Sequence, residues 1–201
     1  SGNNRDSTAY NDYQYVDGIS NEGIHLVGSG GTGLNGGHVI LPFIALNEFP
    51  AFTLSIWVNY EGSTYVHGDS FIEFGARTDP SGGGKIVTMM WEWDNTLVFG
   101  VGDRDDSAGV SVPFPSDFIG NWYHLVLRAD NGTLTAFVNG QLVGTDYYQQ
   151  LGTMSPVAGI GCHWFNSGGT ESNRFIGTID DVRIYDRALT DAEVKTMYQN
   201  P

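Results

Sequence analysis

The sequence has 201 residues, with 23 aspartates and glutamates against 9 lysines and arginines, so its formal net charge at pH 7 is −14. This charge disfavours binding to nucleic acid or anionic membrane surfaces, and no apolar run approaches the roughly 18 residues of a membrane helix. The single cysteine, Cys162, excludes an intramolecular disulfide. The length fits one large domain of the size of a β-sandwich. The excess of carboxylates is compatible with calcium binding and equally with an acidic surface that only keeps the protein soluble.

The N-terminal region predicts loops and short strands. Residues 1–37 are rich in glycine, asparagine and serine with scattered tyrosines, and one strand is expected around Ile24 and Leu26. The glycine-rich run 28–37 lacks the Gly-Lys-[Ser/Thr] ending of a phosphate-binding loop, so it is interpreted as an ordinary loop. Residues 39–43 predict the next strand.

The middle of the chain predicts successive antiparallel strands. Residues 52–58 alternate between a strongly apolar face and a mixed face, which indicates a core strand. Further strands are expected over 71–75, 86–94 and 97–101, separated by segments rich in glycine, proline and aspartate.

Two Asn-Gly pairs predict a three-stranded meander. Strands 122–129, 133–138 and 141–145 are separated by Asn131-Gly132 and Asn139-Gly140. Both residues of such a pair tolerate positive φ, which the tight turns of hairpins require.

The C-terminal run 175–198 predicts a closing strand followed by a short helix. Val182 and Ile184 fall on the apolar face of a half-buried strand, with charged residues on the other face. Thr190 and Glu193 have the spacing of a capping box, so a helix of about two turns should follow. It is expected to dock on the sheet through Ala192, Val194 and Met197 or Tyr198.

Three stretches resemble one known family. The run Gly177–Thr190 closely resembles the C-terminal signature of the laminin-G-like modules of bacterial extracellular proteins, a branch of the concanavalin A-like lectin/glucanase superfamily. Phe52–Val58 is similar to the family's Phe-Thr-x-Ser-x-Trp-Val strand, and residues 121–144 are similar to its Trp-Tyr-His hairpin. Together these stretches span the chain from about residue 50 to its end.

The resemblance implies an all-β fold, an antiparallel two-sheet jelly-roll sandwich of the concanavalin A type with a short C-terminal helix. Residues 1–201 are expected to form this one domain, in a secreted or cell-surface protein. The segment Ser1–Asn4 resembles the middle of a family motif whose usual leading strand is absent. We therefore expect the domain to be excised from a longer extracellular chain.

The resemblance also implies a structural Ca²⁺ that ties the N-terminal segment to the closing strand. Carried over to this sequence, its ligands are an oxygen from a residue such as Asn3 and a carboxylate from Asp180 or Asp181. Two adjacent carboxylates repel one another unless something neutralises them, and calcium is one such partner. Arg183 and Arg187 are the alternative.

Carbohydrate binding requires flat apolar faces for the C–H side of a sugar and planar polar groups for its hydroxyls. Two sets of residues offer this combination: Trp91 and Trp93 on a strand that also carries acidic side chains, and His163, Trp164 and Asn166 in a loop. Aromatic residues at a two-residue spacing also suit a sandwich core, so core packing is the alternative for Trp91 and Trp93.

The sequence carries only part of a catalytic pattern. Glycosidases of the superfamily that this chain resembles carry two glutamates around an aspartate on one strand. Glu92 and Asp94 begin that pattern, but no second glutamate follows, and retaining hydrolysis needs two carboxyl groups about 5–5.5 Å apart. A carboxylate from another strand, such as Glu73, is the remaining way to complete the pair.

We therefore predict a non-catalytic, calcium-supported carbohydrate-binding module of a secreted polysaccharide-degrading enzyme or adhesin. Its expected partners are a poly- or oligosaccharide and the other domains of a longer chain, with neither nucleic acid nor membrane insertion. A protein-binding or spacer domain is the main alternative, and a glycoside hydrolase is the third.

Overall fold

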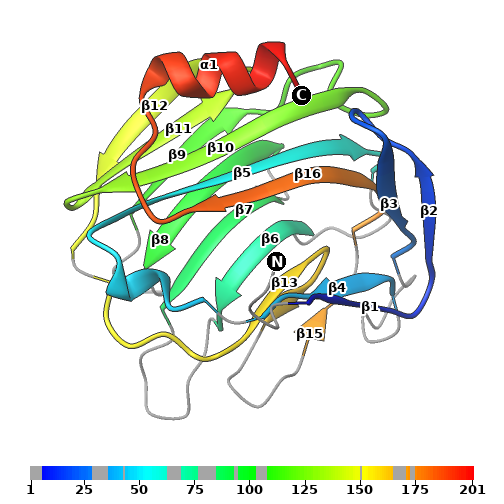
Figure 1. Ribbon diagram of the computed structural model, residues 1–201, viewed down its shortest axis with the longest axis horizontal. Helices are drawn as coiled ribbons and strands as arrows, with labels where there is room; N and C mark the ends of the chain where they lie inside the picture. Colours follow the sequence, from blue (N-terminus) through cyan, green and yellow to red (C-terminus); the bar gives the residue numbers. More distant parts are fainter. Residues whose placement is uncertain are drawn as a thin grey trace.

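The computed structural model describes residues 6–28, 36–42, 44–62, 69–76, 85–92, 95–102, 108–149, 151–164, 171–172 and 175–201. Two seven-stranded antiparallel sheets pack face to face, and one helix lies outside them (Figure 1). The predicted all-β jelly-roll sandwich of the concanavalin A type is confirmed.

We name each sheet after a central strand. The β6 sheet contains, in spatial order, β1 (Thr8–Tyr10), β4 (His38–Ile40), β13 (Ala158–Ile160), β6 (Asp69–Gly75), β7 (Ile86–Glu92), β8 (Thr96–Gly102) and β9 (Ala108–Pro113). The β5 sheet contains β12 (Gln141–Tyr147), β11 (Thr133–Val138), β10 (Trp122–Asp130), β5 (Ala51–Tyr60), β16 (Gly177–Tyr185), β3 (Glu22–Leu26) and β2 (Tyr13–Asp17). The remaining elements are the small pair β14 (His163–Trp164) and β15 (Glu171–Ser172), the 3₁₀ turn η1 (Leu46–Glu48) and the helix α1 (Asp191–Gln199).

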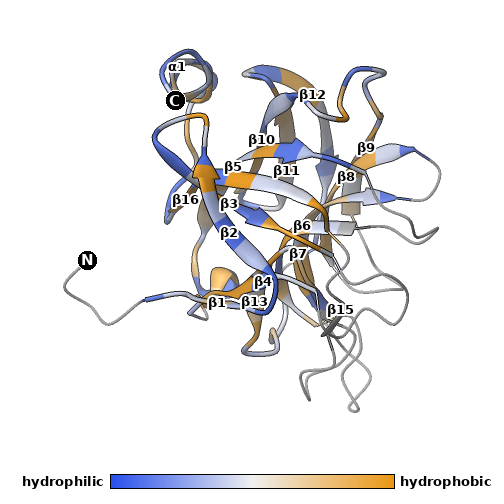
Figure 2. Cartoon of the chain, turned by 90° about the vertical axis from the view of Figure 1, so that its right-hand side faces the viewer, coloured by the Kyte–Doolittle hydropathy of each residue, from blue (hydrophilic) through white to orange (hydrophobic). Residues whose placement is uncertain are grey.

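The core lies between the sheets and follows the predicted alternation. The apolar residues of β5 face the β6 sheet and are buried: Phe52, Leu54, Ile56 and Val58. One part of the core is filled by large aromatic side chains that contact one another, among them Tyr60, Phe71, Phe118 and Phe175. Strand by strand, hydrophobic and hydrophilic segments alternate in Figure 2, as expected for sheets with one face in the core.

The predicted strict alternation of side chains along β16 is wrong at one point. A β-bulge lies between Asp180 and Arg183, where Asp181 takes a positive φ of 48°. The extra residue shifts the alternation by one position. Ile184 faces the core as predicted, but Ile179, expected among the charged residues, is buried there too.

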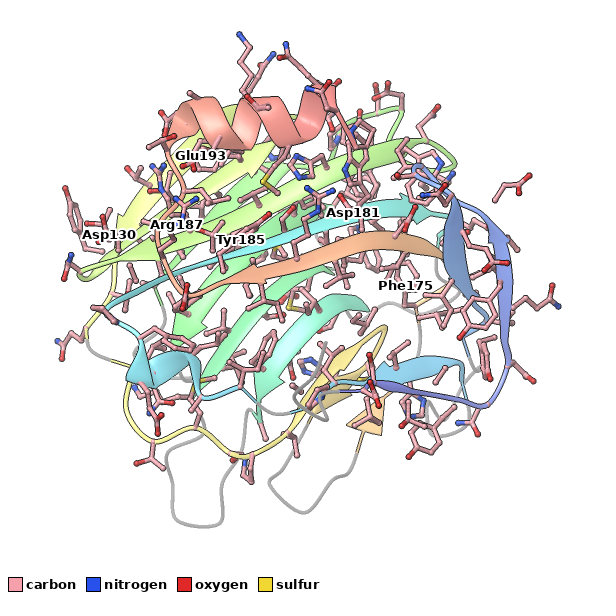
Figure 3. All side chains as sticks on the ribbon, viewed as in Figure 1. Asp130, Phe175, Asp181, Tyr185, Arg187 and Glu193 are labelled. Carbon is pink, nitrogen blue, oxygen red and sulfur yellow. The ribbon has the colours of Figure 1, made fainter. Side chains whose placement is uncertain are left out.

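Helix α1 begins as predicted. The Thr190 hydroxyl accepts a hydrogen bond from the Glu193 backbone N–H, and the Glu193 carboxylate accepts one from the Thr190 N–H at 2.8 Å. Arg187 adds two hydrogen bonds to the same carboxylate, at 2.6 and 3.1 Å, near the start of the helix (Figure 3). These contacts together lower the pKa of Glu193 to about 2, with the Arg187 hydrogen bond contributing most.

The helix packs on the outer face of the β5 sheet. Val194 and Met197 are buried against that sheet as predicted, whereas Ala192 is exposed and the prediction for it is wrong. Tyr198 is partly exposed and stacks on Trp57 of β5, with ring centroids 5.7 Å apart. Among the described residues, no helix has the length and apolar character needed to cross a membrane.

Candidate functional site in a cleft between the sheets

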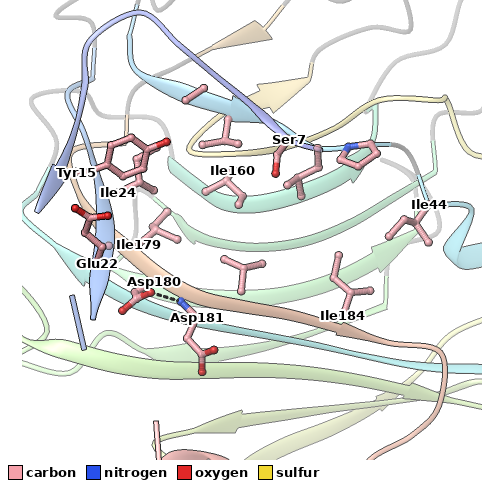
Figure 4. Close-up of a pocket in the computed structure, with 16 residues that line it drawn as sticks. Ser7, Tyr15, Glu22, Ile24, Ile44, Ile160, Ile179, Asp180, Asp181 and Ile184 are labelled. Carbon is pink, nitrogen blue, oxygen red and sulfur yellow. Dashed lines mark hydrogen bonds between the residues drawn. The ribbon is translucent and has the colours of Figure 1, made fainter. Parts of the chain in front are cut away.

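An open cleft of 410 Å³ lies between the two sheets (Figure 4). Strands β2, β3 and β16 of the β5 sheet form one wall, and β1, β4 and β13 of the β6 sheet form the other. Its interior is lined by aliphatic side chains, including Ile24, Val39, Ile160, Ile179 and Ile184.

The size of the side chains explains why the cleft exists. The part of the core around Tyr60 and Phe71 is filled by aromatic rings that contact one another at centroid distances near 6 Å. In the cleft, both sheets present shorter branched residues, which do not span the same separation. Because protein interiors are otherwise close-packed, a space of this volume at the surface indicates room for a ligand.

The mouth of the cleft is polar and acidic. Tyr15 and Glu22 come from the β2–β3 hairpin, in which Tyr15 pairs with Ile24, and Asp180 comes from β16. The Tyr15 side chain is 64% exposed. No lysine, arginine or histidine is found among the described residues that line the cleft. A ligand there meets one aromatic face and several acceptor oxygens.

Asp180 holds the hairpin turn against β16. Its Oδ2 accepts a hydrogen bond from the Ser20 N–H at 3.0 Å, and its Oδ1 accepts one from the Asp181 N–H at 2.6 Å. Gly18 makes this approach possible, because a Cβ at that position would collide with the Asp180 carboxylate. The turn and the acidic rim are thus parts of one rigid unit.

The side chain of Asp181 leaves the cleft and lies on the helix side of β16 (Figures 3 and 4). Arg183 Nε donates to its Oδ1 at 2.6 Å, whereas its Oδ2 is buried and has no hydrogen-bond partner. The arginine alternative for neutralising this carboxylate therefore holds for Arg183. Arg187 pairs with Glu193 instead.

These positions bear on the expected calcium ion. No group of three or more histidine, cysteine, aspartate or glutamate residues suited to a metal comes together within the described ranges. Asp180 accepts one backbone N–H with each of its oxygens, and each oxygen keeps a further lone pair that a cation can use. Asp181 Oδ2 is an unpartnered oxygen of the kind that calcium binds. Asn3, the third predicted ligand, lies outside the described residues.

Trp91, the first residue of the predicted tryptophan pair, is not among the residues that line the cleft. Trp91 is half-buried on the core side of β7, with its ring 6.1 Å from Tyr60 and 6.4 Å from Phe114. This placement agrees with the core-packing alternative. The indole Nε1 is buried without a hydrogen-bond partner. Trp93 lies outside the described residues.

The predicted loop set is described only at its start. His163 is buried, and its Nδ1 lies 2.7 Å from Glu73 Oε2 and 3.0 Å from Ser70 Oγ, both on β6. The backbone of Trp164 belongs to β14, but its side chain is not among the described ones, and Asn166 lies outside the described residues. A direct saccharide contact by these residues stays a prediction.

The positions of Glu73 and Glu92 bear on the catalytic alternative. Glu73 is in register with Thr88, and Glu92 lies four residues further along β7 on the same face. At about 3.3 Å per residue, the two backbone positions are about 13 Å apart. Retaining and inverting enzymes hold their carboxyl groups about 5–5.5 Å and 6.5–9.5 Å apart, so the two side chains would have to extend towards one another to pair. Glu73 Oε2 instead lies 2.7 Å from His163 Nδ1.

Sequence reasoning missed Tyr15 and Glu22 as site residues. The available signal was the Tyr13-Gln14-Tyr15 alternation, which places two tyrosines on one face of a short strand. Their rings lie 5.8 Å apart in an edge-to-face contact. Nothing in the linear pattern placed this hairpin beside Asp180.

Comparisons with known proteins agree with this architecture. A laminin G family model, described as the concanavalin A-like lectin/glucanases superfamily, matches residues 30–195. A comparison with curated protein sequences found no match.

Among solved structures, the chain is similar to domain 4 of AbnA, a GH43 extracellular arabinanase from Geobacillus stearothermophilus, in complex with arabinotriose. The TM-score is 0.70 with 22% identity over 96% of this chain and 88% of that chain. It is also similar to the binding domain of botulinum neurotoxin DC in complex with rat synaptotagmin II, with a TM-score of 0.74 and 15% identity over 98% of this chain and 47% of that one.

A third similar structure is that of botulinum neurotoxin type C, whose cell entry depends on interaction with two ganglioside molecules. Its TM-score is 0.73, with 16% identity over 98% of this chain and 47% of that chain. The chain thus spans about half the length of the neurotoxin chains it matches. At these identities the solved structures show a shared fold. The family model covers most of the sequence, and the chain belongs to the concanavalin A-like lectin/glucanases superfamily, in its laminin-G-like branch.

Proposed function

We propose that this chain is a non-catalytic carbohydrate-binding module and that the cleft between the sheets holds part of the saccharide. The observation that carries the proposal is the composition of the cleft, which joins apolar walls and an exposed tyrosine to an acidic rim. The C–H face of a sugar packs on Tyr15 and Ile24, and its hydroxyls donate to Glu22 and Asp180. Each carboxylate oxygen accepts more than one hydrogen bond, so Asp180 retains acceptor capacity.

The relatives support this proposal. The arabinanase domain is named in complex with arabinotriose, and the type C neurotoxin is named for its interaction with gangliosides. The arabinanase is extracellular, and the matching neurotoxin chains are about twice as long as this one. The proposal therefore includes a secreted or cell-surface location and further domains in a longer chain.

The contacts predicted from the sequence, Trp91, Trp93, His163, Trp164 and Asn166, form a second part of the proposal. They are tested separately from the cleft, because none of them is among the described residues that line it. Trp164→Ala is the most direct variant, and unchanged saccharide affinity in it would remove the loop from the site.

Calcium support is a further part of the proposal, with Asn3, Asp180 and Asp181 as the residues that would hold the ion. Bound calcium stabilises the folded state by mass action. The melting midpoint should rise with added calcium and fall with EDTA in the wild type, and Asp181→Asn should reduce both effects. An unchanged midpoint in the wild type would rule the ion out.

The cleft is tested by affinity electrophoresis on a panel of polysaccharides that includes arabinan. Tyr15→Ala should weaken retention about tenfold, because an aromatic contact contributes about 0.5–1.5 kcal/mol beyond its buried area. Tyr10→Ala removes another exposed tyrosine, on β1 and outside the cleft lining, and should leave retention unchanged. Equal retention of wild type and Tyr15→Ala would exclude the cleft.

A protein-binding domain is the second candidate, because the neurotoxin DC binding domain is named in complex with synaptotagmin II. Failure of every polysaccharide to retain the wild type, together with a purified protein partner that binds it, would favour this candidate. Hydrolysis makes a different prediction. Reducing ends would accumulate with the wild type and disappear with Glu92→Gln.

A further inference from the structure

A second pocket lies away from the acidic mouth of the cleft, at the opposite end of the β5 sheet. Its volume is 400 Å³, within the range of about 300–1,000 Å³ typical of small-molecule sites. Three separate segments form it: Asn47 and Phe49 at η1, the turn Asn131–Gly132 between β10 and β11, and Tyr148 directly after β12. Figure 1 shows η1 and this turn at the left of the molecule and β2 and β3 at the right.

Backbone hydrogen bonds fix these segments relative to one another. The Asn131 N–H donates to the Pro50 carbonyl at 3.2 Å, which joins the turn to the segment after η1. The Tyr148 N–H donates to the Gly132 carbonyl at 2.8 Å, which joins the end of β12 to the same turn. Asn131 and Gly132 take positive φ values of 45° and 85°, as a tight hairpin turn requires. A pocket held in this way is preformed, which reduces the entropy cost of binding.

The lining of the pocket is uncharged and combines amides with aromatic rings. Asn47 and Asn131 each offer both a donor and an acceptor, which matches the hydroxyls of a sugar, since each hydroxyl also donates and accepts. The Asn131 Nδ2 donates to Asp130 Oδ1 at 2.7 Å, which orients the amide. Phe49 and Tyr148 are half-buried and provide apolar faces.

Tyr148 is held at the wall of the pocket. Burial raises the pKa of its phenol, a hydrogen bond from the Gly132 backbone acts in the opposite direction, and the charge of Asp130 raises it further. The hydroxyl is therefore neutral and lies against the hairpin turn. It adds a third uncharged polar group beside the two amides.

We infer that this pocket is a second saccharide-binding site, one that takes a neutral sugar unit. The described lining itself contains no charged side chain, and the Asp130 carboxylate beside it accepts a hydrogen bond from the Asn131 amide. The pocket shares no lining residue with the cleft, so the inference stands independently of the cleft.

Chemical-shift mapping of the ¹⁵N-labelled chain tests this inference. The probe is an equimolar mixture of the methyl glycosides of glucose, galactose, mannose and arabinose. We expect saturable shifts at the backbone amides of Asn47, Gly132 and Tyr148. Shifts confined to the hairpin amides around Gly23 would overturn the second site while supporting the cleft. Shifts at the pocket alone would support the second site and contradict the cleft, and no shifts at the pocket would overturn the inference.

Two variants add a second test. Asn47→Ala removes one amide and should weaken binding at the pocket about tenfold, the effect of losing roughly 1.4 kcal/mol. Tyr148→Phe keeps the ring and removes only the hydroxyl, so we expect it to fold. It therefore tests the pocket even if Asn47→Ala does not fold. Tyr15→Ala, in the cleft, should leave the pocket shifts unchanged. Equal pocket affinity in wild type, Asn47→Ala and Tyr148→Phe would contradict the assignment.

Discussion

The two sheets each bury a histidine on their outer face, and the two histidines have different surroundings. On the β5 sheet, His124 Nε2 lies 2.8 Å from Ser55 Oγ. Against the β6 sheet, His163 of β14 has its Nδ1 3.0 Å from Ser70 Oγ of β6. His163 has in addition the fully buried carboxylate of Glu73 at 2.7 Å, whereas the ring of His124 lies between aromatic neighbours.

His124 stacks on Trp57 at 5.1 Å and on Tyr198 at 6.3 Å, beneath the end of helix α1. Burial lowers its pKa to about 4, and the charge of Arg183 acts in the same direction. A neutral imidazole suits this place, where the helix closes over the sheet. The contrast teaches that surroundings distinguish two buried histidines with similar serine partners: a carboxylate lies beside His163, whereas burial and the charge of Arg183 disfavour the charged form of His124.

The largest expected effect is on the Glu73–His163 pair. Glu73→Ala should lower the free energy of unfolding by about 3–5 kcal/mol, because it leaves a buried partner uncompensated. Glu73→Gln keeps the shape and a hydrogen-bonding group and should cost less. Urea unfolding of the wild type and of both variants measures these differences in the free energy of unfolding. A cost below about 1 kcal/mol for Glu73→Ala would show that the two groups do not depend on one another.

His124 should make stability depend on pH. Its pKa in the folded state, about 4, is below the ordinary 6.5, so the unfolded state binds a proton first. The contribution of His124 to the free energy of unfolding is therefore fully present above about pH 6.5 and is lost as the pH falls towards 4. The loss is roughly 3 kcal/mol, at about 1.36 kcal/mol per pKa unit. Urea unfolding across this range should show the loss in the wild type and a smaller loss in His124→Gln. Parallel profiles would contradict the assignment.

Weakening the helix should affect one histidine and spare the other. Thr190→Ala removes the N-cap hydroxyl and should cost about 1 kcal/mol. As the helix frays, water reaches His124 and its pKa should rise towards the ordinary value, while the NMR signals of His163 stay unchanged. Equal changes at both imidazoles would indicate that the two faces are coupled.

The smallest effect is expected for Arg187→Ala. The ion pair with Glu193 is exposed to solvent, so its contribution to stability should be smaller than that of the cap and should decrease with salt. Its clearest effect is electrostatic, because Arg187 is the main cause of the low pKa of Glu193. An NMR titration should show the pKa of Glu193 rising from about 2. Lys195→Ala, which removes a charge from the same helix, should leave that value in place.

Much of the fold was predictable because its signals are local. The alternation along β5, the Asn-Gly turns at 131–132 and 139–140, and the capping box of Thr190 and Glu193 each lie within a few residues. Backbone sterics and hydrogen bonding act over that distance, so the elements formed where they were expected. The bulge at Asp181 was not predictable in this way, since it adjusts β16 to two neighbouring strands at once.

The sequence by itself determined the all-β class, the closing strand and helix, the family and the excess of negative charge. Only the tertiary structure decided which residues meet. Tyr15, Glu22 and Asp180 lie at one cleft, where Asp180 also accepts a hydrogen bond from the hairpin turn. Asn47, Asn131 and Tyr148 line one pocket. The physical reason is that binding surfaces are made by contacts between strands far apart in the chain, and no local pattern records which strands become neighbours.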